Sequence, residues 1–261
     1  MRLDIYLKEN NLCKSRQKAS ELIKKGFVKV NDKVIVKTSY AVLETDFVKI
    51  TGDDNPFVSK GGLKLQKAVE CFKIDLKDCT CLDIGASTGG FTDCCLKNGA
   101  KKVYALDVGT SQLDDILIFD KRVINLEKTN IKDISKEIIP EKIDFVCCDV
   151  SFISVCRVAD ALEKFLEDNI FCCFLIKPQF EAGKENINKN GVVRDKKAHI
   201  SIINNIINYF KEKNFYIKAL DFSPIKGGEG NIEYISLFEF KGKSNIFPNI
   251  KETVEKAFKN L

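Results

Sequence analysis

Three ionisable residues in the second half of the chain stand where catalytic groups often lie. Asp149 directly follows the apolar residues 143–148, Lys177 follows 171–176, and Glu233 follows a glycine-rich loop. A lysine among carboxylates can take the proton of a hydroxyl group or stabilise the developing alkoxide, because burial and charge tune its protonation. Each residue alone is more often a polar strand end. Together they favour alkylation of a hydroxyl, a reaction for which we predict no metal.

A glycine-rich loop at residues 83–91, Asp-Ile-Gly-Ala-Ser-Thr-Gly-Gly-Phe, lies between a predicted strand and a predicted helix. Its glycines allow a tight turn and a close approach of the backbone to a ligand. Ser87 stands where a nicotinamide dinucleotide site requires its second glycine, and no P-loop Gly-Lys-Ser/Thr follows. The loop therefore favours S-adenosylmethionine, which has no phosphates. The alternative interpretation is a turn that only packs a strand on a helix.

Two further polar residues would complete such a cofactor site. Asp107, 22 residues after Gly85, ends a second predicted strand and would bind the cofactor's ribose. Asp83 would orient the methionine part, and Asn130 would reach the adenine edge. The candidate cofactor-binding residues are Asp83, Gly85, Ala86, Ser87, Thr88, Gly89, Gly90, Phe91, Asp107 and Asn130.

The elements that must position these residues alternate between strand and helix. We predict strands at 80–84, 103–107, 122–126, 143–148 and 171–176, and helices near 90–98, 110–119, 132–138 and 155–167. This alternation predicts a mainly parallel sheet with helices on both faces.

A longer helix, about 196–213, then precedes strands at 216–222 and 232–240. The connection between these two strands is too short for a crossover helix, so they should pair antiparallel. The pattern is that of a Rossmann-like α/β methyltransferase. Because the last strand runs against the parallel ones, Glu233 at its start should share an edge with Asp149 and Lys177.

The net charge of +5 is concentrated in the first fifth of the chain. Residues 1–51 contain 11 Lys and Arg against 6 Asp and Glu, whereas residues 52–261 contain 31 of each class. A small basic unit beside a neutral body indicates an anionic partner larger than a metabolite. We predict two short helices here, the second capped by Ser15, followed by strands near 27–30, 34–36 and 47–50.

This basic unit resembles the S4 RNA-binding domain. The matching residues are Arg2-Leu-Asp-x-x-Leu7, Ser15-Arg16-x-x-Ala19 and Gly26-x-Val28-x-Val30-Asn31. The resemblance implies a small α+β domain that binds structured RNA through its basic helices. The candidate RNA contacts are Arg2, Lys14, Ser15, Arg16, Lys18, Lys24 and Lys25. The alternative interpretation is a solvated helical face.

Turn and breaker residues at 52–58 indicate a linker. We therefore predict an S4-like domain over 1–51, a linker over 52–58, the methyltransferase domain over 59–242 and a C-terminal accessory helix over 243–261. No apolar run approaches the roughly 20 residues that span a bilayer, and the N-terminus lacks a signal-peptide core, so we expect a cytoplasmic protein.

The eleven cysteines include no Cys-x-x-Cys pair, and His199 is the single histidine. Zinc and iron–sulfur sites need ligand sets at characteristic spacings that this sequence lacks. We interpret the cysteines as reduced, small apolar core residues. A Cys–His nucleophile is disfavoured, because His199 falls in a predicted surface helix.

Over essentially its full length the chain resembles the TlyA family, which combines an S4 domain with an FtsJ-like RNA 2′-O-methyltransferase. The matching blocks begin at Ser59, Leu82, Ala105, Asp149, Lys177, Gly191 and Gly230. The resemblance implies methylation of cytidine ribose in ribosomal RNA, with S-adenosylmethionine as cofactor and ribosomal RNA or ribosomal subunits as partner. It also implies a catalytic tetrad of Lys64, Asp149, Lys177 and Glu233.

The resemblance supplies the choice of Lys64, because the residues alone do not separate it from Lys60 or Lys67. Whether Lys177 or Lys64 activates the hydroxyl stays open. Three alternative functions also stay open: a membrane-active haemolysin, a non-catalytic RNA-binding protein and a base methyltransferase. The last is disfavoured because Lys177-Pro-Gln179 matches none of the motifs usual for base methylation.

Overall fold

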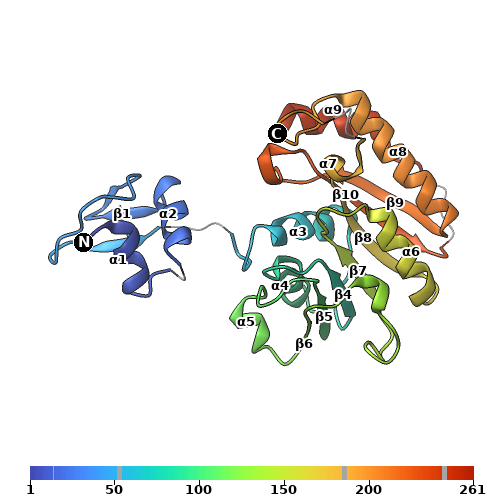
Figure 1. Cartoon of the computed structure of the whole chain (residues 1–261), viewed down its shortest axis with the longest axis horizontal. Coiled ribbons are helices and arrows are strands. Elements are labelled where there is room, and N and C mark those ends of the chain that lie inside the picture. The colour runs from blue at the N-terminus through green and yellow to red at the C-terminus, as the bar shows by residue number, and fades with distance from the viewer. Residues whose placement is uncertain (14, 52–54, 184–186, 243–245) are drawn as a thin grey trace. The chain divides into compact units, whose positions relative to one another are not determined.

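The computed structural model describes residues 1–261 except 14, 52–54, 184–186 and 243–245. The chain divides into two compact units, Met1–Pro56 and Phe57–Leu261 (Figure 1). Phe57 is only 8% exposed and belongs to a hydrophobic core of the second unit, against which Val58 also packs. The predicted linker at 52–58 is therefore too long by these two residues. The Phe57 side chain is buried in the core of the second unit, so that unit begins at Phe57.

The first unit packs two helices on a small antiparallel sheet. The helices are α1 (Leu3–Glu9) and α2 (Arg16–Lys24), and the strands, in the order β2-β1-β3, are β2 (Lys33–Val34), β1 (Val28–Val30) and β3 (Val48–Ile50). The Ser15 hydroxyl accepts a hydrogen bond from the Lys18 backbone N–H, so Ser15 caps α2 as predicted. Leu3, Leu7 and Ile23 are fully buried in the unit's own core.

The second unit is built on a seven-stranded sheet in the order β6-β5-β4-β7-β8-β10-β9. Its strands are β4 (Thr80–Ile84), β5 (Lys102–Leu106), β6 (Val123–Leu126), β7 (Phe145–Cys148), β8 (Ile170–Ile176), β9 (Phe215–Phe222) and β10 (Tyr234–Phe240). Strands β4 to β8 are parallel, and β10 pairs antiparallel with both β8 and β9. This confirms the predicted Rossmann-like α/β fold with its terminal antiparallel pair.

Strand register brings the predicted catalytic residues to one edge. Ile176 pairs with Tyr234, so Lys177 and Glu233 follow at neighbouring positions beyond this pair. Ile84 pairs with Cys148 in the same way. The glycine loop that starts at residue 85 therefore leaves the sheet beside Asp149.

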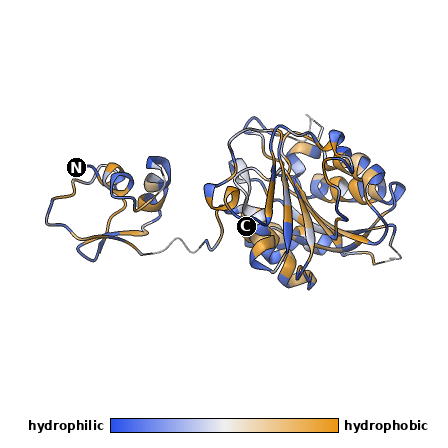
Figure 2. Cartoon of the chain, turned by 90° about the horizontal axis from the view of Figure 1, so that it is seen from below, coloured by the Kyte–Doolittle hydropathy of each residue, from blue (hydrophilic) through white to orange (hydrophobic). Residues whose placement is uncertain are grey.

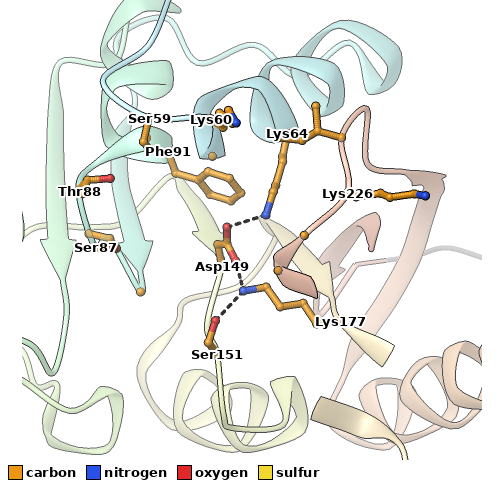
Figure 3. A pocket seen from close by; sticks show the side chains of 17 residues that line it. Ser59, Lys60, Lys64, Ser87, Thr88, Phe91, Asp149, Ser151, Lys177 and Lys226 are labelled. Carbon is orange, nitrogen blue, oxygen red and sulfur yellow. Dashed lines mark hydrogen bonds and ion pairs between the residues drawn. The ribbon is translucent and has the colours of Figure 1, made fainter. Parts of the chain in front are cut away.

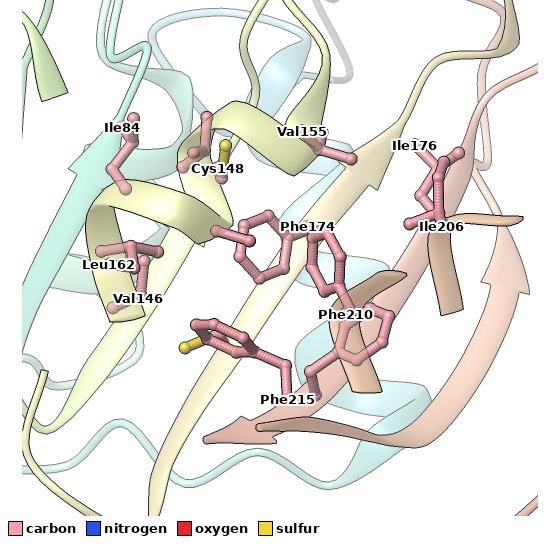
Figure 4. Close-up of a cluster of buried hydrophobic side chains, with 14 of the residues drawn as sticks. Ile84, Val146, Cys148, Val155, Leu162, Phe174, Ile176, Ile206, Phe210 and Phe215 are labelled. Atoms are coloured by element: carbon pink, nitrogen blue, oxygen red, sulfur yellow. The ribbon is translucent and has the colours of Figure 1, made fainter. Parts of the chain in front are cut away.

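Helices cover both faces of this sheet. They are α3 (Gly61–Phe72), α4 (Gly90–Lys97), α5 (Asp115–Ile118), α6 (Val155–Phe165), α7 (Pro178–Glu181), α8 (Lys196–Glu212) and α9 (Ile250–Asn260), with 3-10 turns η1 (Ile131–Asp133) and η3 (Gly228–Gly230). Phe174 of β8 faces the α6–α8 side, where it packs edge-on against Phe210 and Phe215 (Figure 4). Its neighbours Cys173 and Leu175 face the α3–α4 side. Figure 2 shows hydrophobic strands lying between these helices.

Two predicted helices are much shorter than expected. Asp114 caps α5, which therefore begins at residue 115 rather than 110. The predicted helix at 132–138 is only the three-residue turn η1, which the Asn130 side chain caps. The Asp114 and Asn130 side chains accept hydrogen bonds from backbone N–H groups two residues further along the chain. Such local hydrogen bonds favour turns over longer helices.

Two predictions about α8 and the C-terminus are also corrected. Helix α8 does lie at the surface, but His199 is on its inner side and is 1% exposed. Its ring nitrogens are 2.8 Å from the Tyr234 hydroxyl and 3.0 Å from the Val193 carbonyl oxygen. The C-terminal helix starts at residue 250, and its Val254 and Ala257 are fully buried in the main core. It is therefore an integral part of the second unit.

All eleven cysteines are free thiols. Those in β4, α4, β7 and β8 are buried, as expected of small core residues: Cys81, Cys94, Cys95, Cys147, Cys148, Cys172 and Cys173. Among the described residues, none of the helices combines the length and the apolar character that crossing a membrane requires.

Candidate active site

Four charged side chains from four elements form one connected network, of which Figure 3 shows Lys64, Asp149 and Lys177. The Lys64 ammonium, on the first turns of α3, lies 2.7 Å from Glu233 Oε2 and 3.4 Å from Asp149 Oδ2. The Lys177 ammonium lies 2.5 Å from Asp149 Oδ1 and donates to the Ser151 hydroxyl at 2.9 Å. Positive and negative groups therefore alternate from Glu233 through Lys64 and Asp149 to Lys177.

This network is largely removed from water. Glu233, Lys177 and Lys64 are 2%, 7% and 8% exposed. Burial is the largest influence on Lys64 and by itself lowers the pKa of its ammonium, but the nearby Asp149 and Glu233 carboxylates outweigh it and raise the pKa. Lys64 is therefore held as a cation. Two lysines facing two carboxylates leave the buried network without excess charge.

The structure also separates the three lysines that the sequence left open. Of these three, Lys64 joins the network. Lys67, one turn further along α3, bonds to the Phe222 carbonyl oxygen and pairs with Asp221. Lys60 is exposed and lines the cavity in front of the network, as Lys226 does from another loop.

Glycines allow the close backbone contacts that shape the site. Gly85 has φ +81°, and a Cβ there would lie 2.7 Å from the Asp149 carbonyl oxygen. A Cβ on Gly90 would overlap the Ser59 hydroxyl and lie 2.8 Å from the Gly62 backbone nitrogen. The N-terminal ends of α3 and α4 are therefore nearly in contact, which fixes where α3 presents Lys64.

Two cavities meet at the carboxyl edge of the sheet and share Gly85, Ser87, Asp149 and Ser151. The first contains the Lys64 and Lys177 side chains and is lined by six of the predicted cofactor residues, Gly85, Ala86, Ser87, Thr88, Gly90 and Phe91. The second is lined by the predicted Asp107 and Asn130 and by apolar residues, among them Leu106, Ile131, Val150 and Ile153.

Two predicted cofactor residues line neither cavity. Asp83 is fully buried beneath the loop, where it accepts a hydrogen bond from the Thr92 hydroxyl at 2.7 Å. Gly89 has φ +91°, and a Cβ there would run into Leu117 and Leu113. Both residues therefore support the glycine loop from inside the protein: the Asp83 side chain is buried, and the space beside the Gly89 Cα is filled by leucine side chains.

Sequence reasoning missed several residues that line these cavities. Ser151 binds Lys177, and Phe152 is 91% exposed with φ +65° at the rim of the second cavity. Its ring packs against Phe180 at 5.0 Å between centroids. The available signal was their place directly after Asp149, at the end of a parallel strand.

The sequence model of the FtsJ-like methyltransferases matches residues 57–240, and that of the S4 domain matches residues 1–48. Curated relatives share 36–44% identity with the chain over 89–100% of its length. The chain belongs to the TlyA family. Within this family it is an FtsJ-like methyltransferase that carries an S4 domain at its N-terminus.

Two relatives and one solved structure illustrate the TlyA family's range. Hemolysin A of Brachyspira hyodysenteriae is 44% identical and aligns over 91% of this chain and 99% of its own. The 16S/23S rRNA (cytidine-2′-O)-methyltransferase TlyA of Mycobacterium tuberculosis is 38% identical over 89% of this chain and 87% of its own. A hemolysin-named protein from Streptococcus thermophilus has a solved structure with TM-score 0.78 and 38% identity, covering 100% of this chain and 96% of that one.

The cofactor of this TlyA-family chain is S-adenosylmethionine. The second cavity is the candidate site for its adenosine part. The Asp107 carboxylate accepts hydrogen bonds from the backbone N–H groups of Ser87 at 2.8 Å and Gly109 at 2.7 Å, which fixes its orientation. A carboxylate has about four lone-pair sites, so two remain for ribose hydroxyls. The apolar residues around it suit a purine ring.

The S4 unit presents its predicted RNA contacts on and around α2. Arg2 and Arg16 both bind the Asp4 carboxylate. Lys24 is exposed, and Lys25 pairs with Glu21 on the same helix. The Ser15 side chain is engaged as the helix cap, and Lys14 lies outside the described residues.

Proposed function

We propose that the protein transfers the methyl group of S-adenosylmethionine to the 2′-hydroxyl of a cytidine in ribosomal RNA. The observation that carries this proposal is the buried network of Lys64, Asp149, Lys177 and Glu233 beside a cavity suited to the cofactor. The cytidine and the ribosomal RNA come from the name of the Mycobacterium tuberculosis relative. We further propose that the S4 unit holds the RNA, that ribosomal subunits are the partner, and that the protein acts in the cytoplasm.

The two lysines would take different parts in this reaction. Lys177 has one carboxylate partner and a hydroxyl, Ser151. Its ammonium group would first release a proton to solvent, and the neutral amine would then accept the proton of the ribose 2′-hydroxyl. Lys64, held as a cation by Asp149 and Glu233, would stabilise the negative charge that develops on the 2′ oxygen.

S-adenosylmethionine, when bound, supplies a methyl group on a positively charged sulfur. As the O–H bond breaks, the 2′ oxygen would bond to the methyl carbon, and the electrons of the broken carbon–sulfur bond would stay on the sulfur. The hydroxyl proton would go to the neutral amine of Lys177 and from there to solvent. Asp149 lies within reach of both lysines and would keep their side-chain nitrogen atoms on the same side of the ribose.

Lys177→Ala tests the proposal. We expect methyl transfer to ribosomal RNA from cells lacking the gene to fall by about 10²- to 10⁴-fold, the usual contribution of a general base. Cofactor affinity, measured by calorimetry, should stay close to that of the wild type. Lys67→Ala is the matched control, because Lys67 lies on α3 in an ion pair outside the network. Wild-type turnover by Lys177→Ala would contradict the mechanism.

Mapping of 2′-O-methylation tests the substrate separately. Ribosomal RNA from cells with and without the gene should differ at one or more cytidines, and the Lys177→Ala gene should not restore the modification. Identical methylation maps would refute ribosomal RNA as the substrate, even if the purified protein binds the cofactor.

A further inference from the structure

A buried carboxylate in the S4 unit binds two arginine side chains at once. Arg2 donates from Nε to Asp4 Oδ1 at 2.9 Å and from Nη2 to Asp4 Oδ2 at 3.1 Å. Arg16 donates from Nε to Asp4 Oδ2 at 2.8 Å. The two arginines come from different places, one just before α1 and one at the first position of α2. Asp4 therefore joins two elements through their cationic side chains.

The carboxylate and the two guanidinium groups differ sharply in exposure. The Asp4 side chain is 5% exposed, whereas those of Arg2 and Arg16 are 46% and 56% exposed. The Arg2 side chain is the largest influence on the Asp4 carboxyl and, together with Arg16, lowers its pKa to about 2 despite burial. Asp4 is thus a permanent anion behind two exposed cations.

These hydrogen bonds leave donors available on the outer side. A guanidinium has five N–H groups in a fixed planar fork, and the bonds to Asp4 use two from Arg2 and one from Arg16. An unrestrained arginine loses substantial rotamer entropy when it binds a phosphate, so fixing its plane in advance reduces that cost. Lys24 lines the same α1–α2 groove as Asp4 and Arg16.

We propose that Asp4 is a positioning residue that holds Arg2 and Arg16 as a preformed fork for the phosphates of folded RNA. This proposal rests on the proposed function, because it describes how the S4 unit would contact the phosphates of its RNA. It predicts a change in RNA affinity opposite to the one that charge alone predicts. Charge alone predicts that removing an anion strengthens binding to a polyanion, whereas removing a group that positions the arginines weakens it.

Asp4→Asn in the full chain tests whether RNA affinity falls or rises, because asparagine keeps the shape of the side chain and removes its charge. The probe is ribosomal RNA transcribed in vitro and therefore unmethylated. We expect affinity to fall about tenfold, or about 1.4 kcal/mol, since both arginine side chains would then have to be ordered by the RNA itself. Glu44→Gln is the matched control, because Glu44 is an exposed carboxylate of the same unit. Its affinity should equal or slightly exceed that of the wild type.

A double-mutant comparison separates positioning from folding. In an Arg2→Gln, Arg16→Gln background, Asp4→Asn should cause no further loss of affinity, because there is no fork left to hold. A further loss in that background would show that the substitution damages the unit itself and would overturn the proposal. An Asp4→Asn protein that binds as tightly as Glu44→Gln would overturn it as well.

The same series distinguishes this inference from the proposed function. If Arg16→Glu leaves the affinity for the RNA and its salt dependence unchanged, helix α2 does not bind the RNA phosphates, and the RNA-holding role proposed for the S4 unit fails. If Arg16→Glu weakens binding but Asp4→Asn does not, only the positioning role of Asp4 is refuted.

Discussion

Lys64 and Lys177 share Asp149, but their remaining partners differ, and the roles that we propose for them rest on this difference. Lys64 also contacts Glu233, whereas Lys177 contacts the Ser151 hydroxyl. The pKa of Lys64 is raised only because two carboxylates together outweigh its burial. Removing one of them should therefore lower that pKa and deplete the cation that the transition state requires.

Glu233→Gln tests whether a carboxylate partner keeps Lys64 protonated. Methyl transfer at neutral pH should fall by about 10²-fold, which is typical when an active site is deprived of one electrostatic partner. Because Lys64 regains its proton as the pH falls, the ratio of variant to wild-type activity should increase toward acidic pH. Rates measured across a pH series test this directly. A pH-independent ratio would show that Glu233 does not act through the charge of Lys64.

Asp83 should make the stability of the protein depend on pH. Burial raises the pKa of its carboxyl from 3.8 to about 7, which Asp149 increases and the Thr92 hydrogen bond opposes. Between these two values the folded state binds a proton that the unfolded state has released, so the free energy of unfolding falls as the pH rises.

Asp83→Asn should remove that slope. At pH 8 the variant should be more stable than the wild type by about 2–4 kcal/mol, because each pKa unit corresponds to roughly 1.4 kcal/mol. At pH 4 the two proteins should differ little. Denaturant unfolding at both pH values provides the measurement, and parallel stability curves for variant and wild type would contradict the prediction.

At the scale of elements, the contact between α3 and α4 determines where Lys64 lies. Gly90→Ala would place a methyl group 2.8 Å from the backbone nitrogen of Gly62, so α3 must move. We expect kcat to fall by about tenfold to a hundredfold, since misplacement of a catalytic group by 1 Å can cost that much. Adding Ser59→Ala should not restore activity, because backbone atoms remain in the way. Recovery in the double variant would locate the conflict in the Ser59 side chain alone.

The positions and relative directions of the strands could be predicted because their apolar runs are short and separated by clear turn residues. The same patterns placed Asp149, Lys177 and Glu233 at one edge, since strand direction alone determines which ends meet. The predictions that were wrong concern which side chains are buried. Residues such as Asp83 and His199 are buried by tertiary packing, and the sequence pattern around them gave no sign of it.

The choice of Lys64 shows most clearly what the sequence pattern cannot predict. Lys60, Lys64 and Lys67 lie within two helical turns, and only the packing of α3 on α4 decides which one reaches the sheet edge. That packing depends on glycines far apart in the sequence. The family resemblance pointed to Lys64, the lysine that joins the buried network, where the physical pattern of one segment could not.

At the scale of the whole molecule, charge and chemistry are divided between two units with separate cores. Residues 1–51 carry the entire net charge of +5, while the buried network lies in the second unit. Binding to RNA through its phosphates depends strongly on salt, whereas S-adenosylmethionine, for which we propose the cavities beside Asp149, has no phosphate groups. The two activities should therefore be separable.

Residues 57–261 alone provide the test, because this unit contains its own sheet, both of its hydrophobic cores and the complete network. The isolated unit should bind S-adenosylmethionine within about twofold of the full chain, since every cavity-lining residue is retained. Its affinity for ribosomal RNA should fall, and the slope of log affinity against log salt should shrink by about one for each phosphate that Arg2, Arg16 and their neighbours no longer neutralise. Filter binding over a salt series and calorimetry with the cofactor supply both readings. An unchanged salt slope would assign phosphate binding to the methyltransferase unit, and the basic charge of the first fifth of the chain would then need another partner.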